Sequence, residues 1–107
     1  MRFRIILISA LLVIGCGETK EQAPAHVGKK VYEQYCRSCH HAGLAGSPEY
    51  RKPSDWEERV NKGRETLLTN VVTGITPGMP PKGLCMSCSE RELLDAIDYM
   101  LPDSKTE

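Results

Sequence analysis

The residues of this 107-residue chain that are best suited to chemistry are its five cysteines. They comprise one single residue, Cys16, and two pairs with two residues between their members, Cys36 with Cys39 and Cys85 with Cys88. A pair at this spacing can attach a haem, bind zinc or form a redox site, and its surroundings decide between these uses. His40 directly follows the first pair, so residues 36–40 read C-x-x-C-H, the attachment signature of c-type haem.

The spacing of this motif suits covalent attachment of a haem. Two thiols three residues apart lie on one helical turn, and each can form a thioether with a haem vinyl group. His40, the next residue, can then project its imidazole to the iron. We therefore predict one covalent haem c, attached at Cys36 and Cys39, with His40 as an axial ligand of the iron.

Two other uses of the first cysteine pair compete with haem attachment. A thioredoxin-like redox site needs a βαβ context, which this sequence lacks. A zinc site of four cysteines, completed by Cys85 and Cys88, has sensible ligand spacing and is the stronger alternative. The histidine directly after Cys39, an N-terminal export signal and a loop that contains a methionine all favour haem over zinc.

A six-coordinate haem iron needs a second axial ligand. The candidates are Met79, Met86, Met100, His26 and His41. Met79 lies in the stretch Thr-Pro-Gly-Met-Pro-Pro, where prolines stiffen the backbone and the glycine permits a close approach. A rigid loop suits a weak Fe–S bond, because the loop need not be ordered when the bond forms. Met100 falls on the apolar face of the last helix and Met86 lies between two close cysteines, so we predict Met79 as the ligand. Met/His ligation raises the reduction potential of a haem.

The first 25 residues are predicted to direct export and anchoring. A short basic start is followed by ten residues that are apolar except for Ser9, too few to span a bilayer. The sequence Val-Ile-Gly-Cys that ends at Cys16 resembles the bacterial lipobox, although an ordinary signal peptide with an incidental cysteine is the alternative. We predict a lipoprotein signal peptide over residues 1–15, an acylated Cys16, and a polar tether over residues 16–25. The protein is then lipid-anchored to a bacterial membrane on its periplasmic, extracytoplasmic side, where disulfides persist.

The composition of the chain excludes some classes of function. Its 14 basic and 14 acidic residues balance, and no basic stripe is present, so nucleic-acid binding is not expected. The part after the leader has one Trp and four Tyr as its only large aromatic residues. A small domain with so thin a core usually needs a metal, a disulfide or a cofactor, and a buried haem would supply the missing apolar volume.

The hydrophobic pattern predicts an all-α domain over residues 26–102, with a short tail at residues 103–107. Residues 42–53 and 74–83 are rich in glycine and proline and are predicted to be loops. No repeat or convincing strand is present.

Four helices are predicted in this domain. The first spans residues 26–37, the second spans residues 54–62 and opens with a capping-box pattern from Ser54, and the third spans residues 64–73. The last opens with a second capping box from Ser89 and ends before Pro102. The apolar positions at helical spacing are Val27, Val31, Tyr32 and Tyr35 in the first helix, Leu67, Leu68, Val71 and Val72 in the third, and Leu93, Ala96, Ile97 and Met100 in the last.

Taken together, these motifs resemble class I cytochrome c. The shared features are a Gly-x-x-Val-Tyr helix from Gly28, the C-x-x-C-H motif, a later Met-Pro-Pro and a closing helix that ends in Tyr99 and Met100. Three details are most similar to the cytochrome c5 branch. They are the loop over residues 41–48, Trp56, and a second cysteine pair after Met-Pro-Pro-Lys-Gly. The resemblance implies a small cytochrome c-like fold of four short helices around one haem. The lipid-type leader departs from it, since such a leader is not a defining mark of the family.

The resemblance also implies roles for individual residues. The carbonyl of Pro48 would accept a hydrogen bond from the second imidazole nitrogen of His40 and fix the ring. Gly28 would let the first and last helices cross closely, with Tyr32 and Tyr99 near the contact. Cys85 and Cys88 would form a disulfide that braces the loop after Met79. Trp56 and Arg59 share a short helix and either contact the haem propionates or serve the core, and neither is assigned as a site.

These features predict an electron carrier, not an enzyme. With both axial positions filled, the iron has no open place for a substrate, and no acid–base motif is present. We expect transfer of single electrons between membrane or periplasmic redox proteins. A haem peroxidase or a sensor that releases Met79 for a small gas is the alternative, and the zinc module is less favoured.

Overall fold

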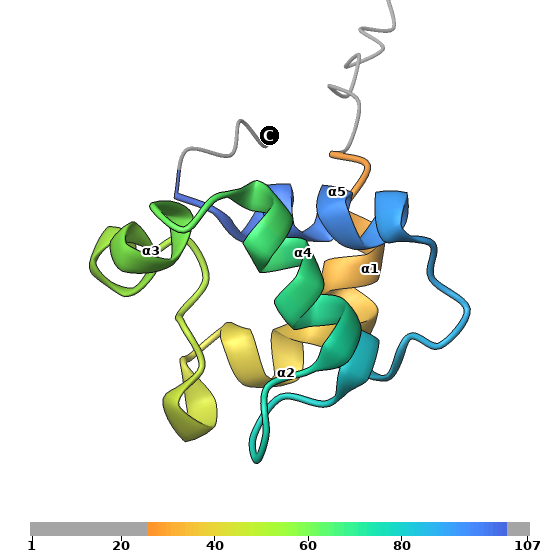
Figure 1. Ribbon diagram of the computed structural model, residues 1–107, viewed down its shortest axis with the longest axis horizontal. Coiled ribbons are helices and arrows are strands. Elements are labelled where there is room, and N and C mark those ends of the chain that lie inside the picture. Colours follow the sequence, from red (N-terminus) through yellow and green to blue (C-terminus); the bar gives the residue numbers. More distant parts are fainter. Residues whose placement is uncertain (1–25, 103–107) are drawn as a thin grey trace, which may run out of the picture.

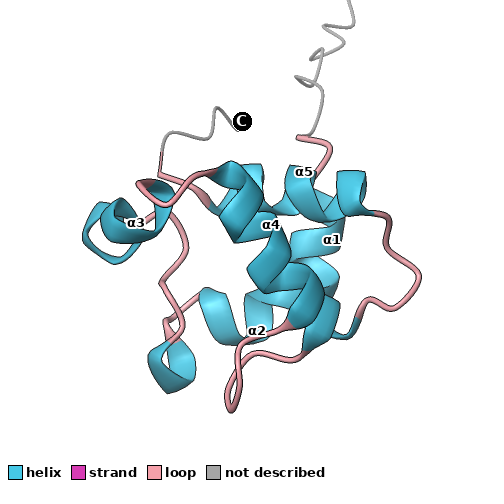
Figure 2. Cartoon of the chain, in the orientation of Figure 1, coloured by secondary structure: helices cyan, strands magenta, loops and turns pink. Residues whose placement is uncertain are grey.

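The structure is a computed structural model that describes residues 26–102. The predicted signal peptide, Cys16 and the tether lie outside these residues, as does the C-terminal tail. The described chain forms helices joined by loops, and its β pairing is limited to one bridge between Ile75 and Met79 (Figures 1 and 2). The all-α prediction is confirmed. Within the same stretch of chain, no helix is long and apolar enough to cross a membrane.

The helical elements are short. In chain order they are α1 (Lys29–Val31), the π-helical turn η1 (Tyr32–Cys36), α2 (Arg37–His40), the 3-10 turn η2 (Leu44–Gly46), α3 (Pro53–Val60), α4 (Arg64–Thr73), the 3-10 turn η3 (Pro81–Leu84) and α5 (Glu90–Met100). α5 packs against both α1 and α4 at one end of the molecule. α2 and the loop after α4 lie at the other end (Figure 1).

The predicted first helix is present but differs from a regular α-helix. It continues through the haem motif to His40, and a π-helical turn separates α1 from α2. Because this turn is wider than an α-helical turn, it changes the faces on which the following residues lie. Tyr35, which lies on this turn, is therefore exposed in spite of the prediction. Val27 is exposed for a different reason, because it precedes the first helical residue, Lys29.

The crossing of α1 and α5 is very close, as predicted from Gly28. A Cβ atom on Gly28 would lie 1.8 Å from the carbonyl oxygen of Asp95, so only glycine fits there. The rings of Tyr32 and Tyr99 meet beside this crossing, with 5.1 Å between their centroids. These two tyrosines form a core cluster with Trp56 and Met100. These buried side chains thus pack together where the first and last helices meet.

The predicted capping box at Ser54 is wrong. α3 begins one residue earlier, with Pro53 in its first turn and Lys52 as the N-cap residue. Ser54 lies inside the helix, where its hydroxyl donates to Asp55 Oδ1 at 3.3 Å. Proline is favoured at the first helical position because its fixed φ angle already suits the helix. The helix also ends at Val60, two residues before the predicted end.

The two later helices match their predictions. α4 spans the predicted residues, and α5 begins with a complete capping box. The Ser89 hydroxyl accepts from the Glu92 amide at 3.2 Å, and the Glu92 carboxylate accepts from the Ser89 amide at 2.8 Å. The latter bond lowers the pKa of Glu92 below its ordinary value. The predicted inward positions of α5, Leu93, Ala96, Ile97 and Met100, are all buried.

Candidate functional site

A cavity of about 550 Å³ lies beneath α2, α4 and α5 and is lined mainly by apolar side chains. It brings Met79 to Cys36, Cys39, His40 and Pro48, which lie more than 30 residues earlier in the sequence. Leu67 and Val71 of α4 line it, together with Leu93, Ala96 and Ile97 of α5. A largely apolar cavity with a few convergent polar groups is typical of a cofactor site.

His40 is held in one orientation at the end of α2. Its imidazole is 8 % exposed, and its Nδ1 lies 2.8 Å from the carbonyl oxygen of Pro48. A carbonyl can only accept, so Nδ1 donates the hydrogen and Nε2 of the neutral ring keeps the lone pair that binds a metal. The Trp56 ring lies nearly parallel to the imidazole, with 6.2 Å between centroids.

The electrostatics of the site favour the neutral form of this histidine. Burial lowers the pKa of His40 below its ordinary value, and the positive charge of Arg59 acts in the same direction. The hydrogen bond to Pro48 opposes this shift without reversing it. A neutral imidazole is the form that binds a metal, so His40 is suited to bind one.

The two cysteines of the motif are free thiols that line the same cavity. Cys36 is half-buried and Cys39 is exposed. Burial raises the pKa of the Cys36 thiol to about 11, and its Sγ lies 4.0 Å from the carbonyl oxygen of Val31. Both sulfur atoms are therefore available for thioether bonds to a group in the cavity.

Met79 reaches the cavity from a tightly folded loop. The Ile75 and Met79 backbones exchange two hydrogen bonds, of 2.9 and 2.8 Å. Gly74 has a φ of +75°, and a Cβ there would lie 2.7 Å from the Met79 carbonyl oxygen. Only glycine therefore permits the chain to return so closely past the end of α4. The paired loop thus holds Met79 at the cavity.

The other candidates for an axial ligand are placed less favourably. Met86 is 69 % exposed, and neither Met86 nor His41 lines the cavity. His26 packs on the Tyr99 ring and accepts a hydrogen bond from the Gly28 amide. Met100 lines the cavity but is buried among the aromatic core residues. Met79 is thus the candidate whose thioether combines access to the cavity with a site outside the packed core.

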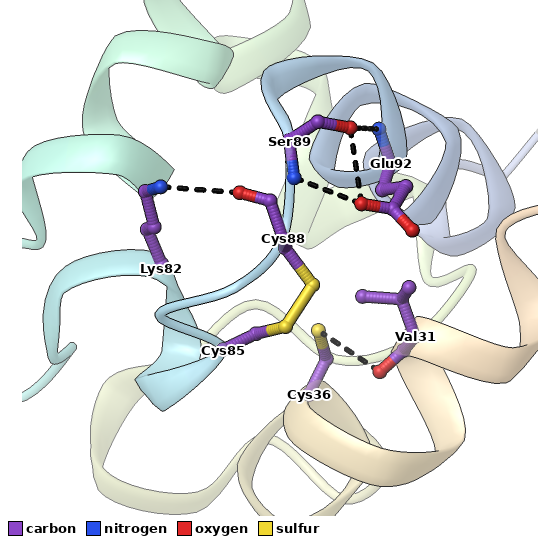
Figure 3. The surroundings of a disulfide bond; sticks show 7 residues. All are labelled: Val31, Cys36, Lys82, Cys85, Cys88, Ser89 and Glu92. Atoms are coloured by element: carbon purple, nitrogen blue, oxygen red, sulfur yellow. Dashed lines mark hydrogen bonds between the residues drawn. A yellow bond between two sulfur atoms is a disulfide. The ribbon is translucent and has the colours of Figure 1, made fainter.

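Cys85 and Cys88 form a disulfide, which contradicts the alternative of a four-cysteine zinc site (Figure 3). Both residues are buried and pack with Leu93. Thiols consumed in a disulfide cannot bind zinc as thiolates. In the chain from residue 26 to residue 102, no group of three or more His, Cys, Asp or Glu side chains is arranged to hold a metal ion.

The disulfide follows a stretch of unfavourable backbone geometry. Lys82, Gly83 and Leu84 have φ angles of +54°, +56° and +71°. Such angles cost roughly 1 kcal/mol or more for a residue other than glycine. The Lys82 ammonium also donates to the Cys88 carbonyl at 3.1 Å (Figure 3). The covalent bridge and this hydrogen bond together close the segment that follows Met79.

One feature of the site was missed from the sequence. Leu44, Ile75 and Leu84 line the cavity and are more than half exposed, so apolar side chains surround its mouth. They come from three loops or turns that are distant in the sequence, and no helical or strand periodicity links them. Apolar residues within segments rich in glycine and proline are the only signal that marks them.

The residues present fit a haem c. The cavity offers two thiols, a neutral imidazole, a thioether and apolar walls, which match the vinyl groups, the iron and the macrocycle of that group. Trp56 also lines the cavity, but it belongs to the buried core, and its only donor, Nε1, is bound to the Glu49 carbonyl oxygen at 2.8 Å.

Comparison with known proteins agrees with this fit. Residues 23–100 match the family model described as cytochrome C oxidase, cbb3-type, subunit III. The chain is 38 % identical over 72 residues to cytochrome c5 of Ectopseudomonas mendocina, covering 65 % of this chain and 82 % of the relative.

Two solved structures have the same fold. A mono-heme ferrocytochrome c from Shewanella putrefaciens is 35 % identical with a TM-score of 0.64, covering 79 % of this chain and 100 % of that protein. A cytochrome c in an electron transfer complex with nitrite reductase is 30 % identical with a TM-score of 0.66, covering 74 % of this chain and 95 % of that one. From its motif, its cavity and these relatives, the chain belongs to the class I c-type cytochromes.

Proposed function

We propose that the protein carries single electrons through one haem c, which is attached at Cys36 and Cys39 and ligated by His40 and Met79. The observation that carries this proposal is the convergence of these four side chains on one apolar cavity. The haem supplies an iron that alternates between ferrous and ferric states, while the protein sets its ligands and its surroundings. The relatives, cytochromes of the c5 type and a mono-heme ferrocytochrome c, support the same role.

The residues of the chain favour a site that changes little when an electron arrives. The carbonyl of Pro48 orients His40, and the paired Ile75 and Met79 backbones hold the methionine loop. The apolar residues of α4 and α5 line the cavity and would keep water away from a haem bound there. Leu44, Ile75 and Leu84 at its mouth form an apolar contact surface for a redox protein.

Carbon monoxide distinguishes a carrier from a sensor or a peroxidase. In a carrier both axial positions stay filled, so the reduced protein at neutral pH is expected to bind carbon monoxide scarcely at all. The absorbance spectrum of the reduced protein is measured before and after the gas is added. Rapid and complete binding would instead show that Met79 is released easily, which would favour the sensor or the peroxidase.

We further propose that the domain is anchored by a lipid on Cys16, on the extracytoplasmic side where cytochromes of this type work. Cys16→Ser is expected to abolish acylation and to release the protein from the membrane fraction if the leader is still cleaved. The haem content is expected to stay unchanged, because Cys16 precedes the domain. Mass spectrometry of the wild type provides the check: a mature protein without acyl chains would contradict the anchor.

The disulfide is proposed to brace the Met79 loop. Replacing Cys85 and Cys88 by alanine is expected to cost on the order of 2 kcal/mol or less in global stability, because the closed loop is short. Met79 is expected to leave the iron at a lower pH during alkaline titration, since the strained segment after it is less restrained. The far-red absorbance of the Fe–S(Met) bond follows this release, and Met86→Ala is the control. An unchanged transition in the double variant would contradict the bracing role.

A further inference from the structure

The peptide group between Pro48 and Glu49 forms a hydrogen bond at each of its two ends. Its carbonyl oxygen, which belongs to Pro48, accepts from Nδ1 of His40 at 2.8 Å. Its N–H, which belongs to Glu49, donates to Oδ2 of Asp55 at 3.0 Å. Because this peptide is planar and trans, its carbonyl and its N–H point in opposite directions. One rigid group therefore links the carboxylate of Asp55 to the imidazole of His40.

The carboxylate of Asp55 is fixed in the first turn of α3. Its other oxygen, Oδ1, pairs with the Lys52 ammonium at 3.4 Å and accepts from the Ser54 hydroxyl at 3.3 Å. The hydrogen bond from the Glu49 amide lowers the pKa of Asp55 below its ordinary value, so the carboxylate is ionised at neutral pH. The Glu49 carbonyl in turn accepts from Nε1 of Trp56 at 2.8 Å. α3 thus holds Glu49 at both its amide and its carbonyl.

A hydrogen bond at one end of a peptide group strengthens the hydrogen bond at its other end. When the N–H donates to an anion, the peptide is polarised and its carbonyl oxygen becomes a better acceptor. The Nδ1 hydrogen of His40 is then held more firmly, and the imidazole becomes a more basic ligand through Nε2. We propose that Asp55 is a positioning residue that orients the His40 imidazole and lowers the reduction potential of the haem through the Pro48–Glu49 peptide. This inference rests on the proposed haem function.

The proposed role predicts the direction of two measurable changes. A more basic imidazole favours ferric iron, which carries the higher positive charge. Loss of the Asp55 carboxylate is therefore expected to make the haem easier to reduce and to loosen the Nδ1 proton of His40. Asparagine keeps an oxygen that accepts from the Glu49 amide but has no charge, whereas alanine keeps neither. Both changes should accordingly be larger in Asp55→Ala than in Asp55→Asn.

The test uses the haem-loaded protein and two measurements. NMR gives the rate at which the Nδ1 proton of His40 exchanges with solvent, and a redox titration gives the equilibrium constant for reduction. Asp55→Ala is expected to speed the exchange about tenfold and to raise the constant about threefold. Asp55→Asn is expected to change them about threefold and about twofold, because a neutral acceptor polarises the peptide less.

Glu57→Gln is the matched control for the loss of a negative charge. Glu57 lies on the same helix, is exposed and does not line the cavity. Its charge is not linked to His40 through a peptide, and water and salt screen it. Both quantities are expected to change by less than about 1.5-fold in this variant.

The outcomes separate this inference from the proposed function. Asp55→Ala with an unchanged exchange rate would overturn the role of Asp55 even if the potential moved, because a charge that acts through space leaves the hydrogen bond of His40 intact. An equal rise of the reduction constant in Glu57→Gln would overturn it too. If Asp55→Ala yields no folded protein, Asp55→Asn decides by itself, and a wild-type value of either quantity contradicts the proposal. A wild-type protein without covalent haem would overturn the proposed function instead.

Discussion

Replacing Met79 by alanine is expected to open the sixth coordination position of the iron while the haem stays attached at Cys36 and Cys39. The far-red absorbance of the Fe–S(Met) bond should disappear, and the reduced variant should bind carbon monoxide. Loss of the thioether should also lower the equilibrium constant for reduction by roughly a hundredfold, or about 120 mV, because axial ligands dominate the potential of a haem. The fold should survive, since the Ile75–Met79 pairing uses backbone atoms only.

The control for this experiment is Met86→Ala. Met86 is 69 % exposed and does not line the cavity, so its removal should change neither the far-red band nor the potential. A band that persists in Met79→Ala would show that another side chain binds the iron. Met100, the other methionine at the cavity, would then be the ligand to test.

The second large effect is expected at the crossing of α1 and α5. Gly28→Ala should destabilise the haem-loaded protein by about 3 kcal/mol, because the added methyl group would lie 1.8 Å from the Asp95 carbonyl oxygen and force the two helices apart. The φ of Gly28 is −77°, which alanine adopts freely, so the loss would come from crowding and not from backbone strain. Denaturant unfolding measures the free-energy change.

Gly78→Ala provides the matched control for crowding. Gly78 lines the cavity, but the structure leaves it room: the nearest protein atom to a Cβ there is the Ala45 carbonyl oxygen at 3.9 Å, an ordinary contact. Its loss of stability should stay below about 1 kcal/mol. If Gly28→Ala costs no more than Gly78→Ala, the close helix crossing is not a determinant of stability.

The last two helices could be predicted because their signals are local. α4 lies between two glycines, Gly63 and Gly74, and the capping box at Ser89 satisfies the first amides of α5 with neighbouring side chains. At α3 the sequence contains two patterns that can start a helix, a capping box at Ser54 and a proline at position 53. The helix begins at Pro53, because the fixed φ angle of proline suits the first helical position. The all-α fold class depends on local signals of this kind, and it was predicted correctly.

Other features depend on contacts that no short stretch of sequence contains. The π-helical turn at Tyr32–Cys36 has no local signal, because the residues before the motif read as an ordinary amphipathic helix. The apolar mouth of the cavity comes from three separate segments, so it exists only in the folded chain. The motif residues themselves could be named from the sequence because chemistry fixes their spacing.

The central claim is that one haem c with histidine and methionine ligands carries single electrons. An equilibrium redox titration of the purified wild-type protein, followed by visible and far-red absorbance, tests it most directly. We predict one transition with the slope of a one-electron couple, together with a far-red Fe–S(Met) band that is present in the oxidised protein and lost on reduction. A protein without haem absorbance, or a titration with no far-red band at any potential, would contradict the account.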